Sequence, residues 1–261
     1  MRPMGQLTFI KYPKIPLLDN ALRILNNKIY IFEKLDGGNC QFRKVDNRIR
    51  CGNRSNFIEG TYFDRGWFPA FRKWAMSNYS LCHIPENLIF FGEWLSVHEI
   101  QYSPGNMNRF YLIDIMDLDN KKFIDYRKAA DIVREFNLEN VNILNIIKES
   151  VAKKEDLESL TKKSDYYNGL REGLVIKDYE RQLFAKMHNP FFQEILANRK
   201  LPPEERFVTE RSVRKAISWL TEDKQQFSRA DLIVYLRKNI NEEFGILLDA
   251  KKIENIVKKV I

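Results

Sequence analysis

The stretch Glu33-Lys34-Leu35-Asp36-Gly37-Gly38-Asn39 combines the residue types that nucleophilic chemistry on a phosphate requires. It follows an apolar alternating run at residues 29–32, which predicts a strand that ends in a tight turn. Such a turn would hold Lys34 rigidly beside a carboxylate and a glycine pair. Partial desolvation favours the neutral, nucleophilic form of a lysine, and glycines let backbone N–H groups approach a phosphate closely. Because a Lys-x-Asp-Gly tetrad also occurs by chance in turns, its meaning depends on the rest of the chain.

Further clusters of reactive side chains are spread widely along the chain. They are Asn53-Arg54-Ser55, Phe91-Gly92-Glu93, Glu172-Gly173-Leu174-Val175-Ile176-Lys177 and Lys186-Met187-His188-Asn189. Glu93 lies inside an apolar run and would be costly to bury without a partner. A core glutamate paired with an arginine is the structural alternative. Taken with Lys34, the clusters supply a nucleophile, carboxylates for a sugar and a metal, and cations for phosphate.

The charge of the chain is compatible with a polyanionic partner. Its 43 lysines and arginines exceed its 35 aspartates and glutamates, which leaves a net charge of +8. Many basic proteins bind no polyanion, so the distribution of charge is more informative. Five basic residues against the single acid Asp46 lie between positions 43 and 54: Arg43, Lys44, Arg48, Arg50 and Arg54. This run is either a solvated hairpin face or a surface that contacts phosphates.

Composition also bears on the compartment and on membranes. No run approaches the ~20 apolar residues of a membrane span, and the first residues lack the apolar core of a signal peptide. The three cysteines (Cys40, Cys51 and Cys82) have no metal-ligand spacing, and their odd number argues against a disulfide framework. We therefore expect an intracellular, cytoplasmic protein without a membrane partner.

Hydrophobic periodicity predicts the elements that position these clusters. Alternation predicts strands at residues 29–35, 39–46 and 48–52, with Asp46-Asn47 as a hairpin turn, and buried strands at 88–95, 109–117, 174–177 and 183–187. Helical spacing predicts helices at 67–78, 126–136 and 151–162. The aromatic residues of the first helix are expected in the core.

A change of character near residue 200 predicts a second domain. Leu201-Pro202-Pro203 is expected to be a linker because prolines block helix continuation. Beyond it the apolar residues follow helical periods, and Ser228 with Asp231 indicates a capping box. We therefore expect a domain at residues 1–200 and a small all-α domain at residues 201–261.

The clusters, taken in order, resemble a known family. Lys-x-Asp-Gly, Arg-Ser, Phe-Gly-Glu, Glu-Gly-x-Val-x-Lys and a final Lys-x-x-Asn are similar to the motifs of the covalent nucleotidyltransferases, which are the ATP-dependent polynucleotide ligases and mRNA capping enzymes. Lys11-Tyr12-Pro13-Lys14-Ile15 and Asn39 make the RNA ligase 2-like branch the best match. The resemblance covers roughly residues 9–192. It implies an α+β fold with ATP-grasp-like antiparallel sheets and helices.

The resemblance also implies roles for individual residues. Lys34 would become adenylylated, while the other nucleotide contacts would come from Glu33, Asp36, Gly37, Asn39, Arg54, Glu93, Val175 and Lys186. An aromatic residue on the strand after Glu93 would stack on adenine, and strand parity favours Tyr111 over Phe110. Glu172 would order a divalent metal, Mg²⁺ or Mn²⁺. Arg54, with Arg50 and His188, would contact the nucleic acid.

One position departs from the family pattern. The last motif has a second lysine in the family, where this chain has His188. An unperturbed histidine titrates near pH ~6.5, so the second cation would be mostly absent at neutral pH unless a substrate phosphate keeps it protonated. We expect weaker charge neutralisation here, which a comparison with His188→Lys between pH 6 and 8 would test.

The implied activity is ligation in three steps through lysyl-AMP, with ATP as cofactor and ends bearing 5′-phosphate and 3′-OH as substrates. DNA ligases and capping enzymes carry a barrel of five strands after the nucleotidyl domain, whereas the tail of this chain has helical periods. An RNA ligase is therefore favoured over the alternative, a DNA ligase. A non-catalytic nucleic-acid-binding module is a further alternative, but it would not need to keep Lys34, Glu93, Glu172 and Lys186.

Overall fold

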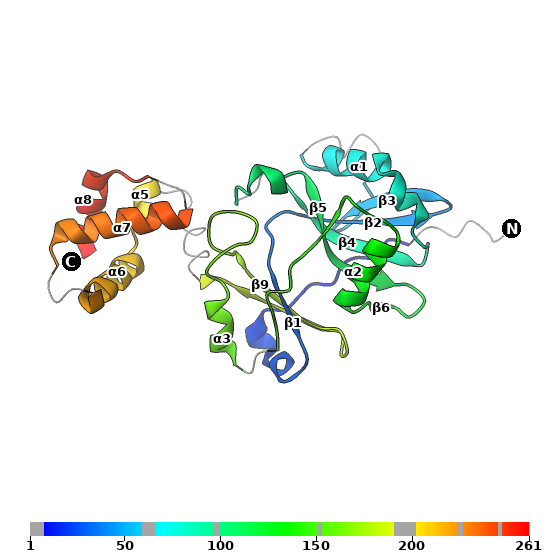
Figure 1. The fold of residues 1–261 in the computed structure, drawn as a ribbon, viewed down its shortest axis with the longest axis horizontal. Coiled ribbons are helices and arrows are strands. Elements are labelled where there is room, and N and C mark those ends of the chain that lie inside the picture. Colours follow the sequence, from blue (N-terminus) through cyan, green and yellow to red (C-terminus); the bar gives the residue numbers. More distant parts are fainter. Residues whose placement is uncertain are drawn as a thin grey trace. The chain divides into compact units, whose positions relative to one another are not determined.

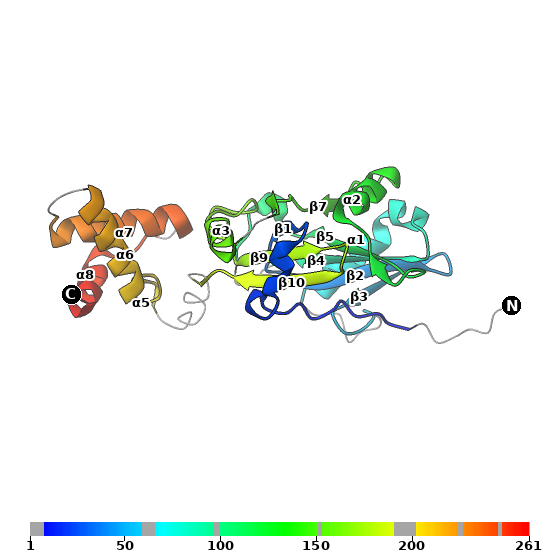
Figure 2. The same ribbon diagram turned by 90° about the horizontal axis from the view of Figure 1, so that it is seen from below.

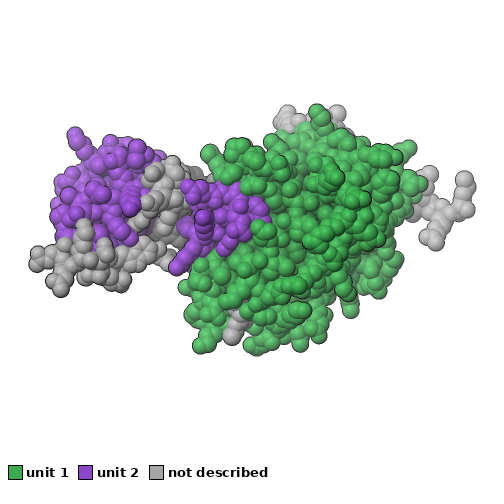
Figure 3. All heavy atoms as spheres, in the orientation of Figure 1, with its two compact units in different colours: residues 1–160, 173–187 green, residues 161–172, 188–261 purple. Residues whose placement is uncertain are grey.

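A computed structural model describes residues 8–58, 66–96, 100–150, 153–190, 202–223, 227–244 and 247–260. Two compact units make up the chain, residues 1–160 with 173–187 and residues 161–172 with 188–261 (Figure 3). The predicted domain boundary after residue 200 falls within residues 191–201, which lie outside the described residues.

A six-stranded sheet forms the larger part of the first unit (Figure 1). Its strands are β2 (Gly38–Val45), β3 (Arg48–Asn53), β4 (Leu88–Leu95), β5 (Arg109–Asp117), β6 (Lys122–Phe123) and β7 (Val141–Ile143). The order is β3-β2-β4-β5-β6, with β7 parallel to β5. The turn residues Asp46 and Asn47 have φ angles of 48° and 59°, the left-handed conformation of a tight hairpin turn. The predicted hairpin is therefore confirmed.

A four-stranded sheet carries the start of the predicted nucleophilic turn. Its strands are β1 (Tyr30–Glu33), β8 (Lys148–Glu149), β9 (Gly173–Asp178) and β10 (Leu183–His188), in the order β10-β9-β1-β8. The first strand is antiparallel to both of its neighbours. In both views β1 lies beside β9, although the two strands are far apart in the sequence (Figure 1 and Figure 2).

Each sheet packs its own helices over a hydrophobic core. Helices α1 (Phe68–Ser77) and α2 (Tyr126–Glu135) contribute Phe71, Ala75, Ala129 and Val133 to the core of the six-stranded sheet. Helix α3 (Lys154–Ser159) and the 3₁₀ turns η1 (Leu18–Asn20) and η2 (Leu22–Asn26) pack on the four-stranded sheet. Two more 3₁₀ turns are η4 (Tyr79–His83) and η5 (Pro104–Asn106). The described part of the predicted helix at 151–162 is shorter than expected.

The second unit contains four helices among its described residues. They are α5 (Pro203–Phe207), α6 (Glu210–Asp223), α7 (Arg229–Phe244) and α8 (Ala250–Val260), and their apolar faces form a separate core. Pro203 is part of a helix rather than a linker, because proline suits a first helical turn. The capping box is confirmed: Ser228 N donates to Asp231 Oδ2 at 2.8 Å, and Asp231 N donates to Ser228 Oγ at 3.2 Å. Among the described helices, none has the length and apolar character needed to cross a membrane.

Candidate active site

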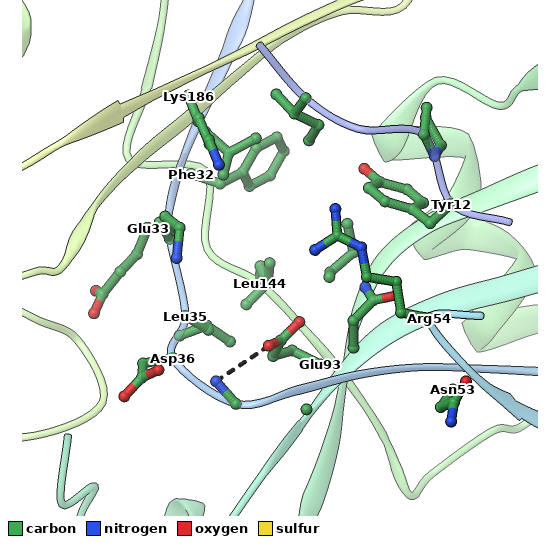
Figure 4. Close-up of a pocket in the computed structure, with 18 of the residues that line it drawn as sticks. Tyr12, Phe32, Glu33, Leu35, Asp36, Asn53, Arg54, Glu93, Leu144 and Lys186 are labelled. Atoms are coloured by element: carbon green, nitrogen blue, oxygen red, sulfur yellow. Dashed lines mark hydrogen bonds between the residues drawn. The ribbon is translucent and has the colours of Figure 1, made fainter. Parts of the chain in front are cut away.

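A cavity of about 530 Å³ in the first unit collects most of the predicted site residues (Figure 4). Its lining comes from both sheets and from the N-terminal segment. The predicted residues that line it are Glu33, Lys34, Asp36, Gly37, Asn39, Arg54, Glu93, Val175 and Lys186. The motifs to which these residues belong therefore meet around one space.

Lys34 is held at the end of β1 by the neighbouring strand. Glu33 pairs with Leu174, and the backbone N of Lys34 donates to the carbonyl O of Gly173 at 2.9 Å. This bond extends the β1–β9 ladder by one residue. The Lys34 side chain is half-buried and lines the cavity. Pairing with β9 therefore fixes the backbone position of Lys34, the candidate nucleophile.

The turn after Lys34 is tied to the other sheet. Asp36 Oδ2 accepts from the backbone N of Ile100 at 2.9 Å, and the backbone N of Gly37 donates to Glu93 Oε1 at 3.1 Å (Figure 4). A Cβ at Gly37 would lie 2.6 Å from the carbonyl O of Trp94, so the turn passes too close to β4 for any side chain. The Gly37 N–H is thus one polar partner of Glu93, which reduces the cost of placing a carboxylate in this apolar strand.

Cations enter the cavity from opposite sides. Asn53 Oδ1 accepts from the backbone N atoms of Ser55 and Asn56, at 2.8 Å each, and this Asx turn presents Arg54. Lys186 lies on β10, and its backbone N donates to the carbonyl O of Pro16 at 2.9 Å. Figure 4 shows the Arg54 and Lys186 side chains pointing into the space from its two sides. Arg54 and Lys186, placed on two sides of one cavity, suit a ligand with several negative charges.

A buried cluster adjoins the cavity, whose lining includes Tyr12 and Lys177, and its internal pairing was not predicted from the sequence. Lys177 Nζ donates to Asp114 Oδ2 and to the carbonyl O of Ile113, each at 2.8 Å. The hydroxyls of Tyr12 and Tyr179 donate to the same carboxylate. Burial lowers the pKa of Lys177, and burial beside Asp114 raises the pKa of Tyr12 and Tyr179 well above the usual value. Since Lys177 is on β9 and Asp114 on β5, the cluster joins the two sheets.

The aromatic residue expected on the strand after Glu93 does not line the cavity. A β-bulge opposite Phe91 and Gly92 interrupts the alternation of β5, because Phe91 pairs with Asp114 and Gly92 with Leu112. Ile113, the unpaired residue of this bulge, lines the cavity. Tyr111 is instead buried, and its hydroxyl donates to Asn106 Oδ1 at 2.8 Å. The alternative, Phe110, lies in the core. Tyr111 is in register with Glu93, as strand parity predicted, and its stacking role stays a prediction from the sequence.

Glu172 and His188 belong to the second unit and form a pair of their own. His188 Nδ1 lies 3.8 Å from Glu172 Oε1, and the backbone N of Asn189 donates to the carbonyl O of Glu172 at 2.8 Å. The described residues contain no cluster of three or more metal-binding side chains. Mg²⁺ is commonly held by one or two carboxylates together with substrate phosphates. Glu172 fits a site in which one protein carboxylate and the substrate phosphates hold the metal. It does not fit a site made by protein ligands alone.

Comparison with known proteins agrees with this geometry. A family model described as RNA ligase matches residues 27–191, more than half of the chain. The chain belongs to the RNA ligase family. No curated protein matches it.

Solved structures of the Naegleria gruberi RNA ligase share the fold. A lysine-to-alanine variant with ATP and Mn is 23% identical at a TM-score of 0.57, covering 71% of this chain and 57% of the other. The same ligase with PPi is 21% identical at a TM-score of 0.56, covering 76% of this chain and 59% of the other. The chain thus spans less than two thirds of the length of these relatives. At this identity the likeness shows the fold, which is mixed α/β with antiparallel sheets.

Proposed function

We propose that the chain is an ATP-dependent polynucleotide ligase that seals 5′-phosphate and 3′-OH ends, with RNA as its favoured substrate. The observation that supports this best is the single cavity lined by Lys34, Glu93, Arg54 and Lys186. These residues come from four separate motifs and provide a nucleophile, a hydroxyl acceptor and two phosphate-binding cations. A binding module would have no need for a half-buried lysine held at the end of a strand.

In the first step, Lys34 Nζ attacks the α-phosphorus of ATP. The new N–P bond forms as the bond to the β-phosphate oxygen breaks, the lysine loses a proton, and pyrophosphate leaves. Arg54 and Lys186 neutralise charge on the phosphate oxygens, and Asp36 and Asn39 help to hold the lysine and the phosphate. Mg²⁺ or Mn²⁺ bound with the nucleotide, with Glu172 as its ligand from the protein, would add charge neutralisation.

The nucleoside is held by the walls between the two sheets. Glu33 is placed at the adenine edge, Glu93 accepts from the ribose hydroxyls, and Val175 covers one face of the base. Ile113 and Phe32 are cavity-lining apolar residues available for the other face. Stacking by Tyr111 stays a prediction from the sequence, and the wall composition favours Ile113 or Phe32 in that place.

The remaining steps transfer AMP to nucleic acid. An oxygen of the 5′-phosphate attacks the phosphorus of lysyl-AMP, which frees Lys34 and forms a pyrophosphate-linked 5′ end. A 3′-OH then attacks the 5′-phosphorus, loses its proton and releases AMP. Arg54 and His188 are proposed to contact the incoming phosphate during these steps.

The helical second unit favours RNA over DNA as substrate. Every element described at residues 202–260 is a helix, whereas a DNA ligase would carry a five-stranded barrel there. We propose a nucleotidyltransferase domain at residues 1–200 and an all-α domain at 201–261. The three cysteines are free thiols, which supports an intracellular setting.

Labelling with α-³²P-ATP tests the proposal directly. The parent protein with Mg²⁺ or Mn²⁺ should retain label on a denaturing gel, and Lys34→Ala should retain none while keeping the circular dichroism of the parent. Lys28→Ala is the matched control, because Lys28 is exposed just before β1 and should label normally. A labelled Lys34→Ala variant would refute the assignment. Ligation of nicked duplexes with ribose or deoxyribose on each side of the nick then identifies the substrate.

A further inference from the structure

The turn that follows Lys34 is bonded to a short segment that the sequence analysis did not single out. The backbone N of Asp36 donates to the hydroxyl of Tyr102 at 2.6 Å, and the backbone N of Ile100 donates to Asp36 Oδ2 at 2.9 Å. Asp36 therefore both donates to and accepts from residues 100–102. Since Asp36 lies two residues after Lys34, these bonds act close to the candidate nucleophile.

Tyr102 belongs to residues 100–108, which precede β5 and which we call the clamp segment. The end of this segment is attached to the six-stranded sheet, because the backbone N of Asn108 donates to the carbonyl O of Leu95 at 2.7 Å. Within the segment, Asn106 Oδ1 accepts from the hydroxyl of Tyr111 on β5 at 2.8 Å. The clamp segment thus connects the turn after Lys34 to β4 and β5.

Burial makes the hydroxyl of Tyr102 difficult to replace. Ile100 is 2% exposed and Tyr102 is 5% exposed, so water has little access to the contact with Asp36. A backbone N–H that loses its partner away from water carries the cost of its own desolvation. Without the hydroxyl, the Asp36 N–H either stays unpaired or moves toward another acceptor. Such a movement would shift the turn that holds Lys34.

The backbone around Lys34 is bonded to several elements in succession. Lys34 N donates to β9, and Gly37 N donates to Glu93 of β4. The bond from Asp36 N to Tyr102 lies between these two points. Phosphoryl transfer depends on the placement of the attacking atom, and a displacement of ~1 Å can reduce a rate about 100-fold. Tyr102 is not among the described residues that line the cavity, so it would act on the reaction through the turn.

We propose that Tyr102 is a positioning residue for the candidate nucleophile. Its hydroxyl, acting through the backbone N of Asp36, keeps Lys34 in line with the α-phosphorus while the N–P bond forms in the first step and while it breaks in the second. This inference rests on the proposed ligase function. In the third step Lys34 neither forms nor breaks a bond, so that step should not depend on Tyr102.

Tyr102→Phe tests this role because it removes the hydroxyl and keeps the ring. In single-turnover labelling with α-³²P-ATP, the maximal rate should fall on the order of tenfold. The ATP concentration that gives half of this rate should stay parental, because the residues proposed to contact the nucleotide are unchanged. A nick that already carries an adenylylated 5′ end, and that the parent seals, should be sealed at the parental rate.

Tyr30→Phe is the matched control. It also removes the hydroxyl of a buried tyrosine, which donates to Asp125 Oδ2 at 3.1 Å, and it does so on β1, the strand that precedes Lys34. This variant should label like the parent. Amide hydrogen exchange gives a readout that needs no reaction: Tyr102→Phe should accelerate exchange at Asp36 and leave β9 protected as in the parent.

The outcomes separate positioning from a general loss of structure and from a failure of the ligase proposal. A variant that loses labelling and sealing of the adenylylated nick together would overturn the positioning role. Unchanged exchange at Asp36, or a rise in the half-maximal ATP concentration at an unchanged maximal rate, would do the same. If the parent labels and Tyr102→Phe labels equally fast, this inference fails and the ligase proposal stands. If the parent itself never labels, both fail.

Discussion

The buried Lys177–Asp114 pair should make a large and coupled contribution to stability. Both side chains are almost inaccessible, 1% and 0% exposed, and their charged atoms lie 2.8 Å apart. Lys177→Met keeps most of the side-chain volume but leaves the Asp114 carboxylate without its cation. Removing one partner of a buried pair costs about 3–5 kcal/mol, and in a unit of this size that corresponds to a fall in Tm of roughly 10 °C.

The double variant Lys177→Met/Asp114→Asn distinguishes a coupled pair from two independent contacts. It removes both buried charges, and the carboxamide that replaces the carboxylate can accept from one of the Tyr12 and Tyr179 hydroxyls and donate to the other. We expect it to recover at least ~2 kcal/mol relative to the sum of the single variants, because no uncompensated charge remains. Urea unfolding followed by tryptophan fluorescence gives each free energy. Single-variant losses that add within ~0.5 kcal/mol would refute the reasoning.

An exposed ion pair supplies the control for this comparison of single and double variants. Arg134 and Asp131 on α2 have side chains that are 68% and 70% exposed, and Arg134→Met should change the free energy of unfolding by no more than ~0.5 kcal/mol. The buried pair should also affect activity, because it joins β5 to β9 and its Lys177 lines the candidate active site. Lys177→Met should therefore reduce labelling by ATP even at temperatures where the variant is fully folded.

Two further outcomes are expected. Gly38→Ala would place a Cβ 2.2 Å from the Trp67 ring, which lines the active-site cavity. We therefore expect the free energy of unfolding to fall by about 1–3 kcal/mol and labelling to weaken. Unchanged labelling at parental stability would contradict this. Ser228→Ala removes one half of the capping box of α7 and should destabilise the second unit by about 1 kcal/mol while lysyl-AMP formation stays at the parental level, as paired unfolding and labelling measurements would show.

Features that depend on local pattern could be predicted from the sequence. Strands β4 and β5 begin and end where the apolar runs do, and the left-handed Asp46-Asn47 turn follows from its composition. The candidate site was found because its motifs carry reactive side chains at strand ends. Periodicity alone could not place those motifs around one cavity.

Other features depend on contacts that no local pattern encodes. The bulge opposite Phe91 and Gly92 makes Ile113 an extra residue of β5, and Ile113 lines the cavity. Lys177 was predicted as the last residue of the Glu-Gly-x-Val-x-Lys motif, but its partner Asp114 lies on a distant strand of the other sheet. The formation of the cavity depends on such long-range pairs.

The position of β1 has a consequence for synthesis of the chain on the ribosome. Tyr30 pairs with Glu149 on one side and with Lys177 on the other, so β1 has no sheet neighbour until most of the first unit has been translated. Lys186, on the opposite side of the cavity from Arg54, is added later still. A nascent chain therefore carries Lys34 for a long time before the cavity around it is complete. Non-local pairing of this kind slows folding, so the strand that precedes Lys34 must stay available and unaggregated during elongation.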